Sequence, residues 1–233
     1  MDGFSYFNIF DTKGIEYIAI LAFFALLIPY WLLLNKQVKI TKQIQKSLGI
    51  LTAGMLRVPQ GLFYAPNHTW SFLERTGIAK VGLDDLLLHL TGEVKLNNLR
   101  KAGEKIEKGE FIAEIEQKGR LLRIFSPISG EIIKANPILS KNPETLNEDP
   151  YGRGWIYKIK PTNWVAETNA CYLADEATNW SSREIDRFKD FVAVSVSKHS
   201  PGVVMQEGGE LRDNTLAELP NEVWQDFQQS FLN

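Results

Sequence analysis

The first strong pattern along the chain is an uninterrupted apolar run near the amino terminus. Residues 17–34, YIAILAFFALLIPYWLLL, contain no charged side chain. A helix of this length spans about 27 Å at ~1.5 Å per residue, close to the ~30 Å hydrocarbon core of a bilayer. Tyr30 and Trp31 near its end are residue types that favour the membrane–water interface. The pattern predicts a single transmembrane helix over residues 15–35 that contacts the lipid bilayer through residues 17–34.

Basic residues flank this run unequally. Lys36, Lys39, Lys42 and Lys46 follow it, whereas only Lys13 precedes it. Basic flanks are retained on the cytoplasmic side of a membrane. We therefore expect a single-pass protein of the cell (inner) membrane with its amino terminus outside and its globular part in the cytoplasm. The flanks do not match a cleaved signal peptide, so the helix is expected to remain attached.

Short apolar alternations punctuated by glycine and proline begin near Phe63. This texture is typical of a compact β domain. Asp84 and Gly92 bracket a short apolar stretch, which predicts a capped helix between them. The stretch IAEIEQKGRLLRIFSPISGEII, residues 112–133, predicts two strands joined by a tight turn. The lysine in that turn, Lys118, is either a chemical attachment point or a solvated charge.

Helical periodicity returns beyond Pro161. Ser181 and Glu184 match a capping box, which predicts that a helix begins there. Two apolar helix faces follow, made of Ile185, Phe188 and Val192 and of Val223, Phe227 and Phe231. These faces indicate an α-rich extension that packs on another part of the protein.

Composition narrows the function classes. The chain has 26 basic and 28 acidic residues, a net charge of -2. This balance gives no overall positive potential that would attract nucleic acid, so we do not expect a nucleic-acid-binding protein. A single cysteine, Cys171, excludes an internal disulfide, and the scattered His68, His89 and His199 predict no metal site. The sequence has no phosphate-binding glycine loop and no nucleophile elbow, so we do not expect an enzyme.

Four segments, in order and spacing, carry a family resemblance. They are NHTWSFLERTGIAKVGLDDLLLHLTGEV, KAGEKIEKGEFIAEIE, FSPISGEII and NPETLNEDPYGRGWIYKIKP. Over about residues 63–162 the chain resembles the glycine cleavage system H protein, a lipoyl-carrier family. The most specific part is NEDPYG followed by GW. The resemblance implies a mainly β, lipoyl-type barrel-sandwich hybrid with short helices, and a hairpin tip that carries lipoate on a lysine.

The hairpin departs from the family at the attachment position. The family's lysine follows a glutamate, a small residue and one further residue, and here Glu116 matches that glutamate. Gly119 then occupies the position of the carrier lysine, and Lys118 lies one place early. Because neighbouring residues of a hairpin point to opposite faces, this shift changes where an amine projects. No cofactor is therefore expected, and lipoate on Lys118 is the alternative.

The rest of the tip also differs. Arg120 and the leucines after it stand where the family usually has small or mildly polar groups. The predicted tip, Glu116, Gln117, Lys118, Gly119 and Arg120, is thus bulkier and more basic than an unobtrusive carrier hairpin. Two interpretations fit this tip equally: a docking surface for a protein partner, or sequence drift after loss of selection for the carrier role.

The sequence predicts five segments. They are an extracytoplasmic amino terminus (1–14), the transmembrane helix (15–35), a basic amphipathic stalk (36–60), an H-protein-like domain (61–162) and the α-rich extension (163–233).

Three functions are compatible with this organisation. The first is a non-lipoylated docking or structural subunit of a membrane-associated complex. The second is a lipoyl carrier with lipoate on Lys118 that shuttles intermediates or electrons between partner enzymes. The third is a membrane-fusion-type transport adaptor, which would place the domain outside and usually contains a long coiled-coil hairpin that this chain lacks.

Overall fold

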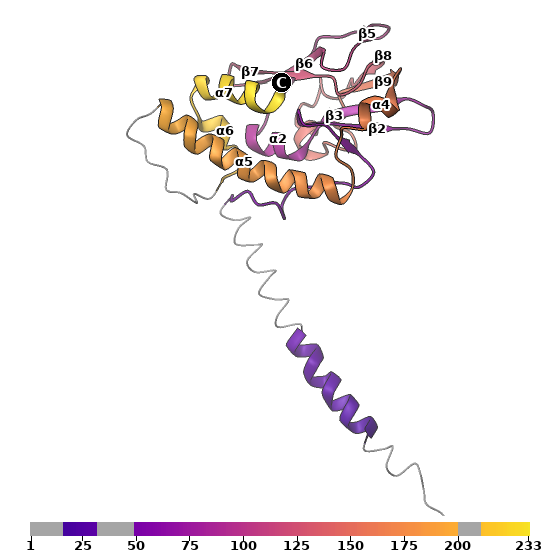
Figure 1. The fold of residues 1–233 in the computed structure, drawn as a ribbon, viewed down its shortest axis with the longest axis vertical. Coiled ribbons are helices and arrows are strands. Elements are labelled where there is room, and N and C mark those ends of the chain that lie inside the picture. The colour runs from indigo at the N-terminus through magenta and orange to yellow at the C-terminus, as the bar shows by residue number, and fades with distance from the viewer. Residues whose placement is uncertain (1–15, 32–48, 200–210) are drawn as a thin grey trace, which may run out of the picture. The chain divides into compact units, whose positions relative to one another are not determined.

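The computed structural model describes residues 16–31, 49–199 and 211–233 of the chain. The chain divides into two compact units, Met1–Leu48 and Gly49–Asn233, which Figure 1 shows and which we describe separately.

The described part of the first unit is a helix over residues 16–31. Its side chains are exposed along its whole length, and the large apolar ones run from Tyr17 to Trp31. Among the described residues, no helix has both the length and the apolar character of a membrane span. The predicted amino terminus (1–14), residues 15 and 32–35 of the predicted transmembrane helix and residues 36–48 of the predicted stalk lie outside the described residues.

The second unit contains short strands with two helices among them and further helices after the last strand. The described strands are β1 (Phe63–Tyr64), β2 (Thr69–Leu73), β3 (Ala79–Leu83), β4 (Lys95–Asn98), β5 (Lys105–Ile106), β6 (Phe111–Gln117), β7 (Arg120–Phe125), β8 (Gly130–Ala135) and β9 (Tyr157–Pro161). The helices are α2 (Asp85–Thr91), α3 (Thr145–Glu148), α4 (Trp164–Thr168), α5 (Asp175–His199), α6 (Thr215–Glu218), α7 (Asn221–Phe227) and the π-helical η1 (Gln228–Leu232). Five of these helices lie beyond Pro161, in the part of the chain where helical periodicity returns.

The strands form two antiparallel sheets. One has the order β1-β2-β3-β9-β8-β5, and the other has the order β4-β6-β7. Alternate residues of both sheets point into a shared core, as the fully buried Val81, Ile115 and Ile159 show. The predicted mainly β architecture is confirmed.

Helix α2 begins and ends where the sequence predicts. The Asp84 carboxylate accepts a hydrogen bond from the Leu87 amide at 2.8 Å, which satisfies a free donor of the first turn. Gly92 ends the helix with a φ of 75°, a left-handed conformation that glycine adopts without a Cβ clash.

The predicted start of the long carboxyl-terminal helix is wrong. Helix α5 begins at Asp175, so Ser181 and Glu184 lie inside it and form no capping box. Both side chains are buried, and Glu184 contacts ionic partners in place of the helix amides. The acidic residues that favour the amino-terminal end of the helix dipole are Asp175 and Glu176.

The helical extension packs directly on the β domain. Phe188 of α5 contacts Phe227 and Phe231 with ring centroids 5.7 and 5.9 Å apart, and all three side chains are buried. They belong to the same apolar cluster as the strand residues. Residues 163–199 and 211–233 therefore share one core with the sheets, a point that the sequence leaves open.

Candidate functional site

The β6–β7 hairpin ends in a two-residue turn. Gln117 pairs with Arg120, which leaves Lys118 and Gly119 as the turn residues, with φ of 50° and 81°. Positive φ at both central positions is the requirement of a type I′ turn, the geometry that matches the twist of a hairpin. Both residues are exposed, and nothing lies within 4 Å of a Cβ built on Gly119.

Among the five predicted tip residues, only Lys118 and Gly119 are exposed to solvent, and only Lys118 has a side chain that projects from the turn. Gln117 is buried, and its side-chain amide donates a hydrogen bond to the Thr91 carbonyl at the end of α2. Glu116 is half-buried and lies opposite Lys95 on β4. The predicted tip residues are thus brought together at one end of the three-stranded sheet, and Lys118 supplies its exposed amine.

Arg120 connects the tip to the carboxyl-terminal helices. Its guanidinium donates hydrogen bonds to the carbonyls of Leu219 at 2.6 Å and Ala217 at 2.5 Å. It also stacks over the buried Trp224 ring at 4.7 Å, a favourable cation–π geometry. The Trp224 indole in turn donates to the Leu216 carbonyl at 2.7 Å. The extension therefore holds one side of the hairpin in place.

The outer edge of β7 is capped by a side chain. The Gln228 amide accepts from the Arg123 backbone N–H at 2.6 Å and donates to the Arg123 carbonyl at 3.2 Å. These are the two bonds that another strand would make at this position. Unpaired strand edges can pair with strands of other chains, and Gln228 prevents this at Arg123 by occupying both of its backbone hydrogen-bonding groups.

Removing this cap has a local, measurable consequence. We expect Gln228→Ala to cost about 1 kcal/mol, because two hydrogen bonds are exchanged for bonds to water. Hydrogen exchange of the Arg123 amide should accelerate about fivefold. Gln229→Ala, at the exposed next position, is the matched control. Equal exchange rates in the wild type and Gln228→Ala would show that the edge is protected by something else.

A second polar cluster connects the β domain to the extension. The fully buried His68 ring lies 2.8 Å from Asp84 through Nδ1 and 3.6 Å from Glu184 through Nε2. The rings of Trp180 and Phe231 flank it at 5.3 and 6.0 Å. Burial alone would lower the pKa of His68, but the two carboxylates outweigh it and raise the pKa to about 9.

This cluster lies outside the predicted tip. The sequence predicts no metal site at His68, and the structure places this side chain between two acids that are 100 residues apart in the chain. Glu184 also pairs with Arg187 at 2.9 Å, and the same environment lowers the pKa of Glu184 against the effect of burial. Only the histidine itself signalled this site in the sequence.

His89 makes no comparable buried site. His89 is partly exposed and lies 2.7 Å from Asp213 and 3.4 Å from Asp85. His199 is the last described residue of α5. Within residues 16–31, 49–199 and 211–233, no group of three or more histidine, cysteine, aspartate or glutamate side chains is arranged to hold a metal ion.

Comparison with known proteins assigns the β domain to a family. The family model described as glycine cleavage H-protein matches residues 62–182, just over half of the chain. This match extends beyond residue 162, where the sequence resemblance ends, and includes α4 and the start of α5.

Curated relatives carry the same family name. The chain is 37% identical over 118 residues to a probable glycine cleavage system H protein of Pyrococcus abyssi, covering 51% of this chain and 87% of the relative. It is 37% identical to the glycine cleavage system H protein of Bacteroides fragilis, covering 46% and 85%. A crystal structure of a glycine cleavage system H protein from Mycobacterium marinum aligns with a TM-score of 0.42 at 28% identity, covering 45% of this chain and 87% of the other. The chain belongs to the glycine cleavage H-protein family.

Proposed function

We propose that this chain is a membrane-anchored, non-lipoylated member of the H-protein family that acts as a docking or structural subunit of a membrane-associated complex. One observation supports the proposal: Gly119, with a φ of 81°, occupies the turn position that the resemblance assigns to the family's carrier lysine. Glycine has no amine to form the amide bond that attaches lipoate.

Family membership sets the frame for this proposal. Glycine cleavage H-proteins are lipoyl carriers rather than catalysts, so the chain is not an enzyme. A carrier needs an amine at the tip and a tip free to enter its partners. Here the amine position is vacated, and Arg120 beside it is held by two carbonyls of the extension. A bulky, basic hairpin that is fixed by the extension is better suited to binding a protein surface than to carrying a mobile lipoyl group between enzymes.

The second candidate function keeps the carrier role. Lys118 is exposed at the apex of the turn, next to Gly119, and supports attachment of lipoate there. The domain would then shuttle intermediates or electrons between partner enzymes. The two candidates differ in one covalent bond, at the Nζ of Lys118, and the mass of that residue separates them.

Membrane anchoring is part of the proposal. The helix over residues 16–31 exposes large apolar side chains on all sides and has no charged residue after Glu16. Such a surface favours lipid over water. The excess of lysines after residue 34 supports an inner-membrane protein with a cytoplasmic domain. A reporter fused after Pro161 tests that side, because the transport-adaptor alternative requires the domain outside.

Deleting residues 1–34 tests the purpose of the anchor. Confinement to one surface raises the effective concentration of a domain toward fixed partners, typically to the millimolar range. We expect the truncated protein to recover about tenfold less of its companion proteins from membranes solubilised in mild detergent. Folding of the truncated protein is checked by circular dichroism. Undiminished recovery would contradict a tethering role.

A further inference from the structure

The outer face of the six-stranded sheet carries a set of lysines that the proposed function does not use. Residues directly opposite each other on paired strands share a face. On β3, β9 and β8, Lys80 lies opposite Lys158, and Lys158 lies opposite Lys134. Three positive side chains therefore form one row across three neighbouring strands.

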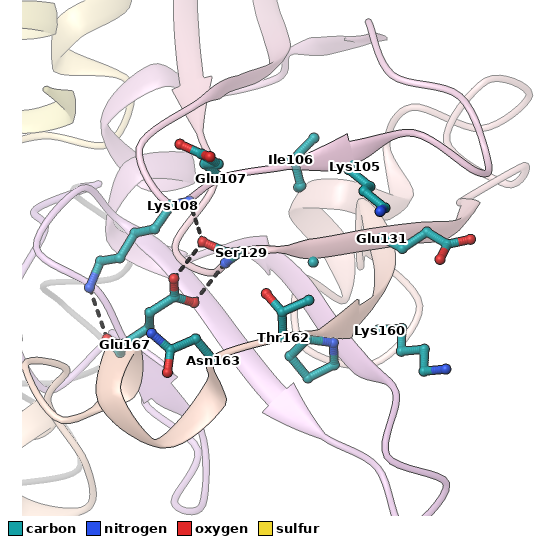
Figure 2. Close-up of a pocket in the computed structure, with 12 residues that line it drawn as sticks. Lys105, Ile106, Glu107, Lys108, Ser129, Glu131, Lys160, Thr162, Asn163 and Glu167 are labelled. Atoms are coloured by element: carbon teal, nitrogen blue, oxygen red, sulfur yellow. Dashed lines mark hydrogen bonds between the residues drawn. The ribbon is translucent and has the colours of Figure 1, made fainter.

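A second row lies beside the first. Lys105 on β5 lies opposite Glu131 on β8, and Glu131 lies opposite Lys160 on β9. Figure 2 shows these three side chains projecting to the same side of the sheet. Lys158 and Lys160 are two residues apart on β9, so the two rows face the same way and are about 7 Å apart.

The acidic residues on this face leave an excess of positive charge. Glu74 pairs with both Lys80 at 3.1 Å and Lys158 at 3.0 Å. Within the described part of the chain, the exposed Lys105, Lys134 and Lys160 have no carboxylate within ion-pair distance. Like charges in a row repel one another, and an external anion relieves that repulsion.

The second row ends at a groove. It has a volume of about 780 Å³, and its walls come from β5, β8, β9 and α4. Figure 2 shows how Glu167 of α4 braces one wall: its carboxylate accepts from the Ser129 amide at 2.7 Å and from the Ser129 hydroxyl. Its backbone carbonyl accepts from Lys108 Nζ at 2.8 Å. The groove is therefore a fixed feature beside Lys105 and Lys160.

We propose that this lysine face is a docking surface for an extended acidic segment of a partner protein. Alternate side chains of an extended peptide repeat about every 7 Å, which matches the separation of Lys158 and Lys160 along β9. Carboxylates at alternate positions would meet both rows, and the groove gives the segment a place to continue. The face belongs to the six-stranded sheet, whereas the hairpin tip belongs to the other sheet.

A protein segment suits this face better than a lipid surface. Glu131 stands between Lys105 and Lys160 and would repel a continuous layer of phosphates. An extended acidic peptide that runs along β9 presents its carboxylates to Lys158 and Lys160 and need not place one over Glu131, which lies on the neighbouring β8. The lysine face would therefore recognise the spacing of the charges on its partner rather than the partner's net charge.

The test uses the full chain in a non-ionic detergent and a fluorescein-labelled peptide of eight Glu-Thr repeats. Fluorescence anisotropy measures binding to the wild type, to the face variant Lys105→Gln/Lys134→Gln/Lys160→Gln, and to the control variant Lys95→Gln/Lys141→Gln/Lys189→Gln. Both variants remove the same charge. We expect the face variant to bind about tenfold more weakly than the control variant at low salt, and Glu131→Gln to bind more tightly than the wild type.

Three results would overturn the proposal. Equal losses in the face and control variants would show that only net charge matters. Absence of peptide binding to the wild type would show that these lysines are only solvated surface residues. The third result concerns vesicles. If the wild type binds phosphatidylserine vesicles more tightly than phosphatidylcholine vesicles, and the face variant loses this preference but still binds the peptide normally, the occupant is lipid.

Discussion

Replacing His68 with leucine is expected to destabilise the Gly49–Asn233 unit by about 3–5 kcal/mol, because it removes the cation that two buried carboxylates share: Glu184 keeps Arg187, whereas Asp84 loses its ion pair. Asp84 and Glu184 approach the ring from opposite sides, and the ring is fully buried. Asp84 also caps α2, and Glu184 lies on α5, so the loss affects the contact between the β domain and the extension. Urea unfolding of the full chain in detergent measures the change.

His89→Leu is the matched control for this substitution. His89 also lies between two carboxylates, but a quarter of its side chain is exposed to water. Water reaches the His89 ring and Asp213, and the buried Asp85 keeps its ion pair with Arg57, so we expect a loss of about 1 kcal/mol or less. Losses of similar size at the two positions would contradict the importance of the buried cluster.

The His68 cluster also predicts a pH dependence with a definite sign. The pKa of His68 is raised from 6.5 to about 9 in the folded protein. Its contribution to stability is therefore complete below pH 6.5 and is lost as the pH rises through 9. We expect the wild type to lose about 3 kcal/mol between pH 6.5 and pH 9.5 from this group, and His68→Leu to lose none of that part. Parallel pH profiles would contradict this assignment.

Truncating Trp224 is expected to have an effect of similar size. Trp224→Ala should cost about 3–5 kcal/mol, because a large buried side chain leaves a cavity. The indole is 1% exposed, donates to the Leu216 carbonyl and lies beneath the Arg120 guanidinium. Its loss should also free the hairpin tip, which hydrogen exchange of the Arg120 and Leu122 amides would report as loss of protection.

The exposed neighbour Gln225 provides the control for Trp224. Gln225→Ala keeps helix α7 and removes no buried contact, so its effect should stay within about 0.5 kcal/mol. If Trp224→Ala lowers stability but leaves the exchange of the tip amides unchanged, the extension does not hold the hairpin. The mobility of the tip would then depend on the turn alone.

The local features of this fold could be predicted because their causes are local. The side chain of Asp84 and the backbone freedom of Gly92 fix the ends of α2, and Lys118-Gly119 fixes the hairpin turn. The alternation along β9 likewise separates the buried Ile159 from the exposed Lys160. Each signal spans only a few residues, so a single sequence contains it.

The features that the sequence did not predict depend on distant contacts. The capping pattern at Ser181 and Glu184 is a chance match, because tertiary packing turns both residues inward and α5 starts earlier. The bonds from Arg120 to the extension join residues about a hundred positions apart. No short pattern encodes such a pairing, and Arg120 alone indicated only a more basic tip.

The mass of the tip peptide tests the central claim most directly. The protein is purified from its own membranes and digested, and the peptide that contains Lys118 and Gly119 is measured by mass spectrometry. A Gly119→Lys variant, which restores an amine at the turn, serves as the positive control for modification. We predict that the wild-type peptide has the mass of the unmodified sequence. A mass increase matching one lipoyl group on Lys118 would contradict the account and show that the chain is a working carrier.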